Sequence, residues 1–199
     1  ALIDIGAATL DVATFNVVLP KESDSTKRIP IFFSAIRPLG THYLTRNRHS
    51  KLNLDFAWDD AMPVETAEVF AQRHGRKSVD VEPFDTDFVS QTARIISAVI
   101  EGTRISSLGD PRNAAWTDGL PIFVTGGGSN CSLYRRAIEK AESEIRKCSL
   151  KRGFRFIELD PLGSKFRRFG ADAGGRASVA IGLTEDADSI ARVIPHRDI

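Results

Sequence analysis

The sequence is poor in cysteine, in net charge and in long apolar runs. Cys131 and Cys148 are the only cysteines among 199 residues, which argues against a disulfide scaffold and for a reducing, cytoplasmic compartment. The formal net charge is only +1, so we expect no nucleic-acid partner. No apolar run reaches about 18 residues and no basic-then-apolar leader is present, so we expect neither a membrane span nor a signal peptide.

Several catalytic motifs are missing as well. No Gly-Lys-Ser or Gly-Lys-Thr occurs, which excludes a P-loop. Gly127-Gly128-Ser129 has Cys131 where a nucleophile elbow needs its second glycine, which argues against a hydrolase. The histidines have no metal-ligand spacing to cysteines or carboxylates; they are His42, His49, His74 and His196.

What is present is the composition of a globular protein. Apolar residues make up 42% and charged residues 27% of the chain, which is enough apolar material for a core. The length predicts one domain, or one domain with an insert. Residues 1–5 already have the composition of a buried strand, which indicates that the chain is part of a longer protein.

Three stretches near the start predict strands. They are residues 1–5, 10–19 and 28–39, which are rich in Val, Ile, Phe and Thr. The polar residues 20–25 predict a turn between the second and the third strand. Three strands joined by short turns predict a meander.

Helical signals dominate the middle of the chain. Residues 42–54 and 63–74 predict short helices, whereas residues 80–87 have the composition of a loop. Apolar residues then recur at helical spacing over 88–102. We expect residues 104–119 to be a connecting loop.

The last third alternates between strand and helix. Strands are predicted at 120–125 and 154–159, and helices at 129–148 and 174–184, an order typical of a parallel α/β unit. The predicted fold class is therefore α/β, with a three-strand meander, parallel strand–helix units and a small helical insert.

The opening hairpin carries one candidate site, Asp4 to Asp11, with the sequence Asp-Ile-Gly-Ala-Ala-Thr-Leu-Asp. Small residues in a tight turn let main-chain N–H groups face phosphate oxygens, and the Thr9 hydroxyl can donate to the same phosphate. Asp4 can hold Mg²⁺ through water, because hard cations prefer carboxylate oxygens. The alternative is a plain hairpin in which these residues serve only the turn.

A second candidate follows a predicted strand, at Gly126-Gly127-Gly128-Ser129. Bare N–H groups at a helix start form a seat for a polar ligand. Glycine also lets a flat base pack against the main chain. The alternative is a tight turn in which Ser129 caps the helix.

Both segments resemble motifs of the actin-like ATPase superfamily, which includes DnaK-type heat-shock chaperones, actins and sugar kinases. Residues 4–12 resemble its second phosphate motif, typically Asp-Leu-Gly-Gly-Gly-Thr-Phe-Asp-Val in the chaperones, and residues 124–129 resemble its adenosine motif. Residues 176–183 resemble its closing helix. The three occur in family order, and the resemblance covers nearly the whole chain.

The resemblance implies a ribonuclease-H-like nucleotide-binding lobe at 1–43 and 86–199, with an inserted helical subdomain at 44–85. It implies ATP or ADP as the ligand and Mg²⁺ as the cofactor, with Asp4 and Thr9 as catalytic residues and Asp4 holding the metal through water. The implied phosphate contacts are Gly6, Ala7, Ala8 and Thr9. The implied adenosine contacts are Gly126, Gly127, Gly128 and Ser129.

The sequence also departs from the family pattern. Ala7 and Ala8 replace glycines, so phosphate affinity is expected to be lower. The arginine that stacks on adenine in chaperones is missing after Ser129. Residues 65–72 best match the helix that reads the ribose, but they lack its basic pair. The other lobe, which carries the first phosphate motif, a catalytic Lys and a second metal Asp, is the implied partner, so this chain alone should hydrolyse little ATP.

Three functions fit this pattern. The first is a chaperone-like ATPase lobe acting on a client protein, and the second is a lobe of a filament-forming actin-like protein that self-associates. The third is a degenerate regulatory lobe, which Ala7 and Ala8 favour; a sugar or acetate kinase uses the same motifs. The many basic residues of the last third are interleaved with glutamates, which is typical of a solvated helix face.

Overall fold

The computed structural model describes residues 1–18, 27–56, 64–106, 113–148, 150–157 and 191–195. Within them lies one six-stranded mixed sheet with the order β5-β4-β1-β2-β3-β6. The strands are β1 (Leu2–Ile5), β2 (Leu10–Phe15), β3 (Arg28–Arg37), β4 (Leu120–Thr125), β5 (Phe154–Phe156) and β6 (Arg192–Ile194). The α/β class predicted from the sequence is therefore confirmed.

The first three strands form an antiparallel meander, as predicted. Leu2 pairs with Ala13 and Ile5 with Leu10, and β2 pairs in turn with β3. Burial alternates along β1 and β2, so that Ile3, Ile5 and Leu10 are fully buried on one face. Strand periodicity of two thus directs one face of the hairpin into the core.

The other strands extend the sheet on both sides. β4 runs parallel to β1, and β5 runs parallel to β4. Helix α5 (Ser132–Cys148) connects β4 with β5, as expected of a parallel strand–helix unit. β6 pairs in parallel with residues 28–30 of β3 at the opposite edge. The sequence did not predict β6, because a three-residue strand carries almost no periodic signal.

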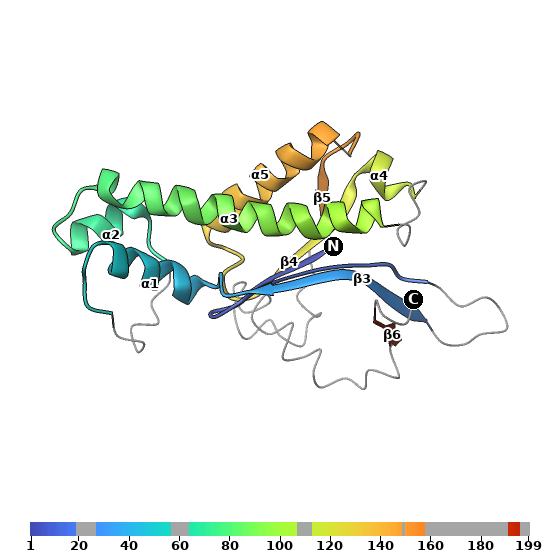
Figure 1. The fold of residues 1–199 in the computed structure, drawn as a ribbon, viewed down its shortest axis with the longest axis horizontal. Helices are drawn as coiled ribbons and strands as arrows, with labels where there is room; N and C mark the ends of the chain where they lie inside the picture. The colour runs from blue at the N-terminus through green and yellow to red at the C-terminus, as the bar shows by residue number, and fades with distance from the viewer. Residues whose placement is uncertain (19–26, 57–63, 107–112, 149, 158–190, 196–199) are drawn as a thin grey trace, which may run out of the picture.

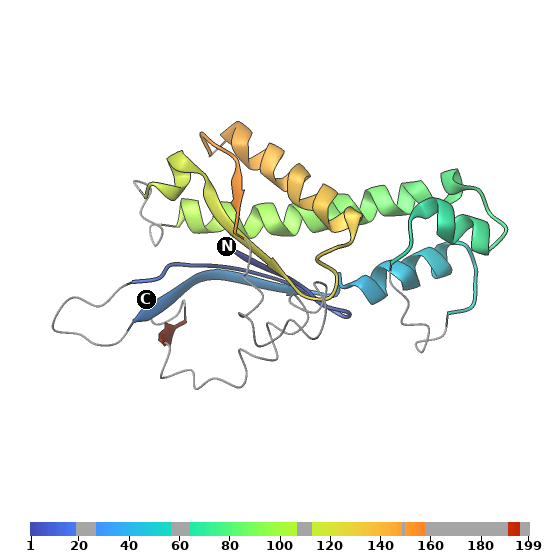
Figure 2. The same ribbon diagram turned by 180° about the vertical axis from the view of Figure 1, so that it is seen from behind.

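The helices occupy one face and one end of the sheet. α3 (Ser78–Ile105) and α5 cover the same face, as Figures 1 and 2 both show. α1 (Thr41–Lys51) and α2 (Ala67–Arg73) pack against the first half of α3, beyond the end of the sheet. The short α4 (Ala115–Asp118) precedes β4.

The prediction of a loop at residues 80–87 is wrong, because these residues belong to α3. Asp80 accepts a hydrogen bond from the main-chain nitrogen of Lys77 at 3.1 Å and so caps the helix start. Val81, Asp85 and Phe88 lie on one buried face at helical spacing. The sequence predicted a loop because aspartate is rare in the buried face of a helix unless another element supplies a partner for its charge.

That partner is Arg48 of α1. Its guanidinium donates to both carboxylate oxygens of Asp85, at 2.7 and 2.6 Å, and also to the carbonyl of Glu65 at 2.8 Å. Arg48 is 1% exposed and Asp85 4% exposed. One ion pair therefore joins α1 to α3 and holds the segment that leads into α2.

Residues within the predicted insert have a small apolar cluster of their own. Phe70, Ala71 and Val81 are buried together, apart from the main core. The predicted boundary between residues 85 and 86 falls inside the continuous helix α3. The division into lobe and insert stays a prediction.

Other predicted boundaries changed little. α3 ends at Ile105, and the predicted connecting loop at 104–119 contains α4. α5 begins three residues later than the predicted 129. The predicted helix at 174–184 and the segment 176–183 lie outside the described residues, as does the end of the strand predicted at 154–159.

We expect Asp85→Ala to destabilise the protein by about 3–5 kcal/mol, because it leaves the Arg48 charge buried without its partner. The double variant Arg48→Met/Asp85→Leu should recover much of that loss, since neither charge is then buried. Urea unfolding measures both values, with the exposed Asp87→Ala as the control. A double variant no more stable than Asp85→Ala would contradict this account.

Candidate functional site

The turn between β1 and β2 comprises Gly6, Ala7, Ala8 and Thr9. The main-chain nitrogen of Gly6 donates to the carbonyl of Thr9 at 2.9 Å and closes the turn. The turn lies at the carboxyl end of β1, next to the carboxyl end of the parallel strand β4. In α/β proteins, ligands bind at the carboxyl ends of adjacent parallel strands whose following connections lead to opposite sides.

The start of α1 holds this turn from one side. Gly40, Thr41 and His42 donate their main-chain N–H groups to the carbonyls of Ala8, Gly6 and Ala7, at 3.1, 3.1 and 2.8 Å. Gly40 has no side chain to cap the helix, so the turn carbonyls satisfy N–H groups that would otherwise lack partners. A Cβ at Gly40 would clash with the main chain of Ala7 and Ala8, so this contact requires glycine.

The direction of these carbonyls sets the direction of the next N–H groups. No described peptide bond is cis, and in a trans peptide the C=O and the following N–H point in opposite directions. The N–H groups of Ala7, Ala8 and Thr9 therefore all point away from α1. Among the described residues they have no hydrogen-bond acceptor. Three neighbouring N–H donors on one side of a turn form a binding site for an anion.

The two alanines do not distort the turn. Neither has a positive φ angle, so the main chain at these positions does not require glycine. Both side chains are exposed. The turn can thus keep its three N–H groups aligned with alanine at both positions; the expectation of lower phosphate affinity stays a prediction.

The glycine turn after β4 packs directly on the first hairpin. Gly126 has φ = +88°, and a Cβ there would clash with the Asp4 carboxylate and the carbonyl of Ile5. The nitrogen of Gly128 donates to the Ile5 carbonyl at 2.9 Å, and a Cβ on Gly128 would clash with Ile5 and Thr41. The structure therefore brings the two predicted motifs together.

Two residues of this turn are less constrained. Gly127 is exposed, and Ser129 donates its main-chain N–H to the carbonyl of Gly126 at 3.2 Å. Ser129 does not lie at the start of α5, because the carbonyl of Cys131 accepts the first N–H groups of that helix, from Tyr134 and Arg135.

Asp4 and Asp11 face each other across the hairpin. They are directly paired in the strand register. Burial, and then the charge of Asp11, raise the pKa of the Asp4 carboxyl. The Thr9 hydroxyl donates to Oδ2 of Asp11 at 3.2 Å, whereas Oδ1 of Asp11 is buried and has no partner within the described part of the chain. Two opposed carboxylates and a buried oxygen without a described partner favour the binding of a cation or of a proton donor between the strands.

A cavity of about 350 Å³ lies beyond the glycine turn, between the start of α5 and the helices α1 to α3. Its lining is mostly polar. Its lining includes Arg48, Glu65, Glu68, Cys131 and Arg136. Burial raises the pKa of the Cys131 thiol, so the uncharged thiol predominates there at neutral pH.

Part of the segment expected near the ribose, residues 65–72, lines this cavity, since Glu65 to Glu68 are among its lining residues. A role of that segment at a ribose stays a prediction. The arginines of the lining come from other elements, since Arg48 lies on α1 and Arg136 on α5. No spacing in the sequence relates these two arginines to residues 65–72, so only the fold could reveal them.

Comparison with protein-family models and with curated proteins finds no match. Within the described ranges, no cluster of three or more His, Cys, Asp or Glu side chains is suited to a metal ion. No helix among the same residues is long and apolar enough to cross a membrane.

We expect Asp4→Asn to raise the melting temperature by about 1–3 °C at pH 7, because a like charge directly opposite Asp11 destabilises the hairpin. A carboxyl whose pKa is raised on folding stabilises the folded state at low pH and loses that contribution as the pH rises. The difference between variant and wild type should therefore vanish toward pH 3. Thermal melts across this range test it.

The exposed Asp55→Asn serves as the control, since it should leave the melting temperature unchanged at either pH. A lower melting temperature for Asp4→Asn at pH 7 would show that the Asp4 carboxylate makes net favourable contacts in the folded protein.

Proposed function

We propose that this chain is an ATP-binding lobe of a DnaK-like ATPase of the actin-like superfamily. The turn from Gly6 to Thr9 binds the phosphates, and the cavity beside the glycine turn binds adenosine. One observation carries the proposal: three N–H groups of the turn point away from α1, because the start of that helix holds the carbonyls of the same peptide groups, and they have no acceptor in the described part of the chain. A phosphate group has the charge and the acceptor oxygens that such donors require.

The order of the strands supports a ribonuclease-H-like lobe. The meander β1-β2-β3 is followed by the parallel strands β4 and β5, with α5 between them. The helices of the predicted insert, α1 and α2, follow β3 and pack against α3. They border the same cavity as the start of α5, which gives the insert a direct role in holding the nucleoside.

The two carboxylates of the hairpin suit Mg²⁺. Asp11 offers a buried oxygen that has no partner among the described residues, and burial beside Asp11 makes the Asp4 carboxylate unfavourable unless a positive charge is near. Asp4 would hold Mg²⁺ through water, Asp11 would offer its oxygen to the same site, and the ion would supply positive charge that neutralises the phosphates. The Thr9 hydroxyl would then donate to a phosphate oxygen in place of Asp11.

The cavity has the size and polarity that a nucleoside needs. Its volume of about 350 Å³ lies within the range of roughly 300–1,000 Å³ typical of small-molecule sites. Glu65 and Glu68 offer acceptors to ribose hydroxyls, and Arg136 offers a cation to stack on a base. Gly126 and Gly128 pack on the first hairpin, and Cys131, three residues further on, lines the cavity, so one nucleotide would occupy both places.

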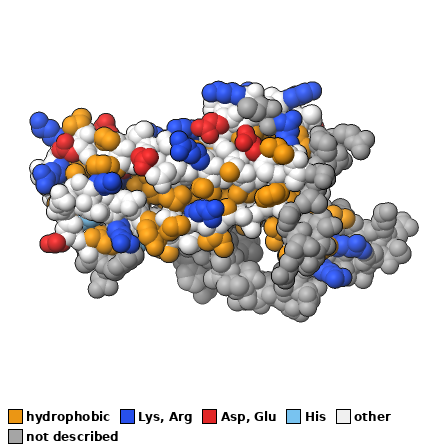
Figure 3. All heavy atoms as spheres, in the orientation of Figure 1, with side chains coloured by type: hydrophobic (Ala, Val, Ile, Leu, Met, Phe, Trp, Pro, Cys, Tyr) orange, Lys and Arg blue, Asp and Glu red, His pale blue; other side chains and the backbone are white. Residues whose placement is uncertain are grey.

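Hydrolysis requires more than this lobe supplies. Phosphoryl transfer depends on positioning and on charges around the whole γ-phosphate, and the residues described here lie on one side of it. The proposed partner is the N-terminal lobe with the first phosphate motif, and beyond it a client protein or further copies of the same protein. Figure 3 shows acidic and basic side chains interspersed on the visible helices, which does not favour nucleic acid.

A degenerate regulatory lobe is the second candidate. Ala7 and Ala8 favour it, because their exposed methyl groups lie beside the donors that a phosphate would approach. Binding of nucleotide by the chain separates the two functions, since a degenerate lobe should bind neither ATP nor ADP.

We expect Ala8→Asp to weaken MgATP binding by at least about tenfold, because it places a negative charge beside the phosphate seat. The exposed, uncharged Ala8→Asn is the matched control and should weaken binding far less. Adenosine should bind all three proteins equally, since it has no phosphate. Isothermal titration calorimetry measures these affinities; no binding of ATP or ADP to the wild type would leave only the degenerate lobe.

Cys131 reports on the adenosine cavity independently. Because its thiol lines the cavity, saturating ADP or adenosine should slow its alkylation by iodoacetamide severalfold at pH 8. Peptide mass spectrometry distinguishes Cys131 from Cys148. Inorganic phosphate should protect Cys131 much less, and equal labelling with and without adenosine would place the nucleoside elsewhere.

A further inference from the structure

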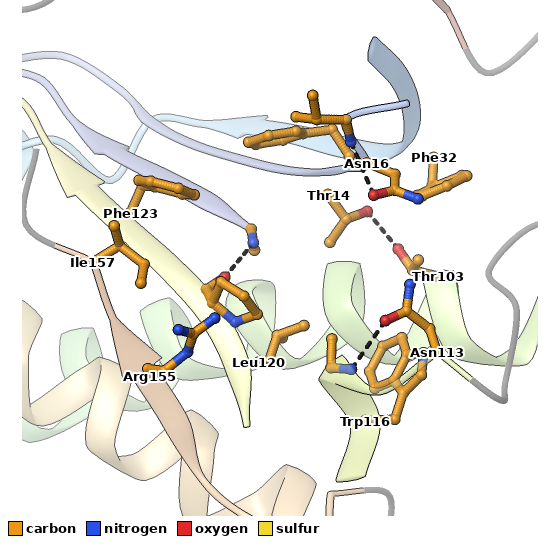
Figure 4. A pocket seen from close by; sticks show the side chains of 15 residues that line it. Thr14, Asn16, Phe32, Thr103, Asn113, Trp116, Leu120, Phe123, Arg155 and Ile157 are labelled. Carbon is orange, nitrogen blue, oxygen red and sulfur yellow. Dashed lines mark hydrogen bonds between the residues drawn. The ribbon is translucent and has the colours of Figure 1, made fainter. Parts of the chain in front are cut away.

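A second cavity, of about 530 Å³, lies at the opposite end of the hairpin from the phosphate turn. It is bounded by the starts of β1 and β4, the end of β2, the last turns of α3 and the residues around α4 (Figure 4). The phosphate turn follows the other ends of β1 and β4. The proposed nucleotide function makes no use of this cavity.

One side of the cavity is aromatic and aliphatic. The rings of Phe15 and Phe123 lie 6.3 Å apart between centroids, with planes inclined by 26°. Trp116 is 7% exposed and also lines the cavity, together with Leu120. A flat aromatic ring can therefore pack here against other rings.

The hydroxyls on the polar side of this cavity are already bonded. The hydroxyls of Thr14 and Thr103 bond to each other, Thr14 also accepts from the nitrogen of Phe33 at 3.1 Å, and Thr103 donates to the carbonyl of Val99 at 3.0 Å. The carbonyl of Pro121 accepts from the nitrogen of Ala1 at 2.6 Å. These groups therefore form part of the cavity wall, and most of their hydrogen-bonding capacity is already used within the protein.

The polar side-chain groups of the lining that have no partner among the described residues are donors. Asn16 and Asn113 each use the side-chain oxygen to accept from the main chain, from Val17 and Ala115, both at 2.9 Å. Their NH₂ groups have no acceptor among the described residues, and neither has the guanidinium of Arg155. Figure 4 places Arg155 across the cavity from the two asparagines. A ligand that satisfies this lining must supply acceptors and a negative charge.

We propose that this cavity binds a small aromatic carboxylate. Its ring packs among Phe15, Phe123 and Trp116, and its carboxylate pairs with Arg155. An acceptor oxygen on the far side of the ring is held by the amides of Asn16 and Asn113. A guanidinium and a carboxylate match in geometry as well as charge, and no Asp or Glu side chain is among the described residues that line the cavity.

The test uses 2-naphthoate as the probe and 2-naphthylmethanol as its uncharged control. Calorimetry on the whole chain should show one saturable site for naphthoate. Arg155→Gln should weaken that binding by at least about tenfold, as expected for loss of a charge-assisted pair. Binding of the alcohol should not change. Arg155 is exposed, so the variant should fold, and the exposed Arg152→Gln, outside the cavity lining, is the matched control.

A second readout locates the ligand. Trp58→Phe leaves Trp116 as the only tryptophan, and its emission should change with naphthoate at the calorimetric midpoint. MgATP at saturation should leave both signals unchanged, because the two sites lie at opposite ends of β1. Three outcomes would overturn the proposal: no saturable binding, equal binding by Arg155→Gln, or displacement of naphthoate by ATP.

Discussion

Three hydrogen bonds between the start of α1 and the first turn hold the candidate site together. They occupy the carbonyls of Gly6, Ala7 and Ala8, and the following N–H groups point to the opposite side, where no other described residue accepts from them. Because these carbonyls accept from the positive end of a helix, the peptide groups are polarised and their N–H groups become better donors. The start of α1 would thus strengthen anion binding by polarising the peptide groups of the turn, without contacting the anion itself.

Close approach of main chains makes this arrangement possible. Gly40, Gly126 and Gly128 lie where a Cβ would clash with the hairpin or with α1. A further contact fixes the same junction, since the Tyr134 hydroxyl of α5 donates to the carbonyl of Leu39 at 2.6 Å. Gly126 and Gly128 of the second motif therefore serve packing against β1.

The long helix α3 connects the two parts of the molecule. Its second half packs on the sheet and its first half packs on α1 and α2. The buried pair of Arg48 and Asp85 sits where these parts meet and lines the smaller cavity. A change in how α1 and α2 pack on α3 would therefore alter both the cavity and the support of the phosphate turn.

The sequence alone determined the strands of the hairpin, the apolar faces of the main helices and the residue types of both turns, because each depends on local periodicity or local main-chain freedom. Only the tertiary structure decided that Gly40 meets Ala7, that Arg136 joins Arg48 around one cavity, and that residues 80–87 are helical. The last case shows the reason. Asp85 is stable inside a helix because Arg48, on another element, neutralises it, and no local pattern encodes a partner that folding alone brings near.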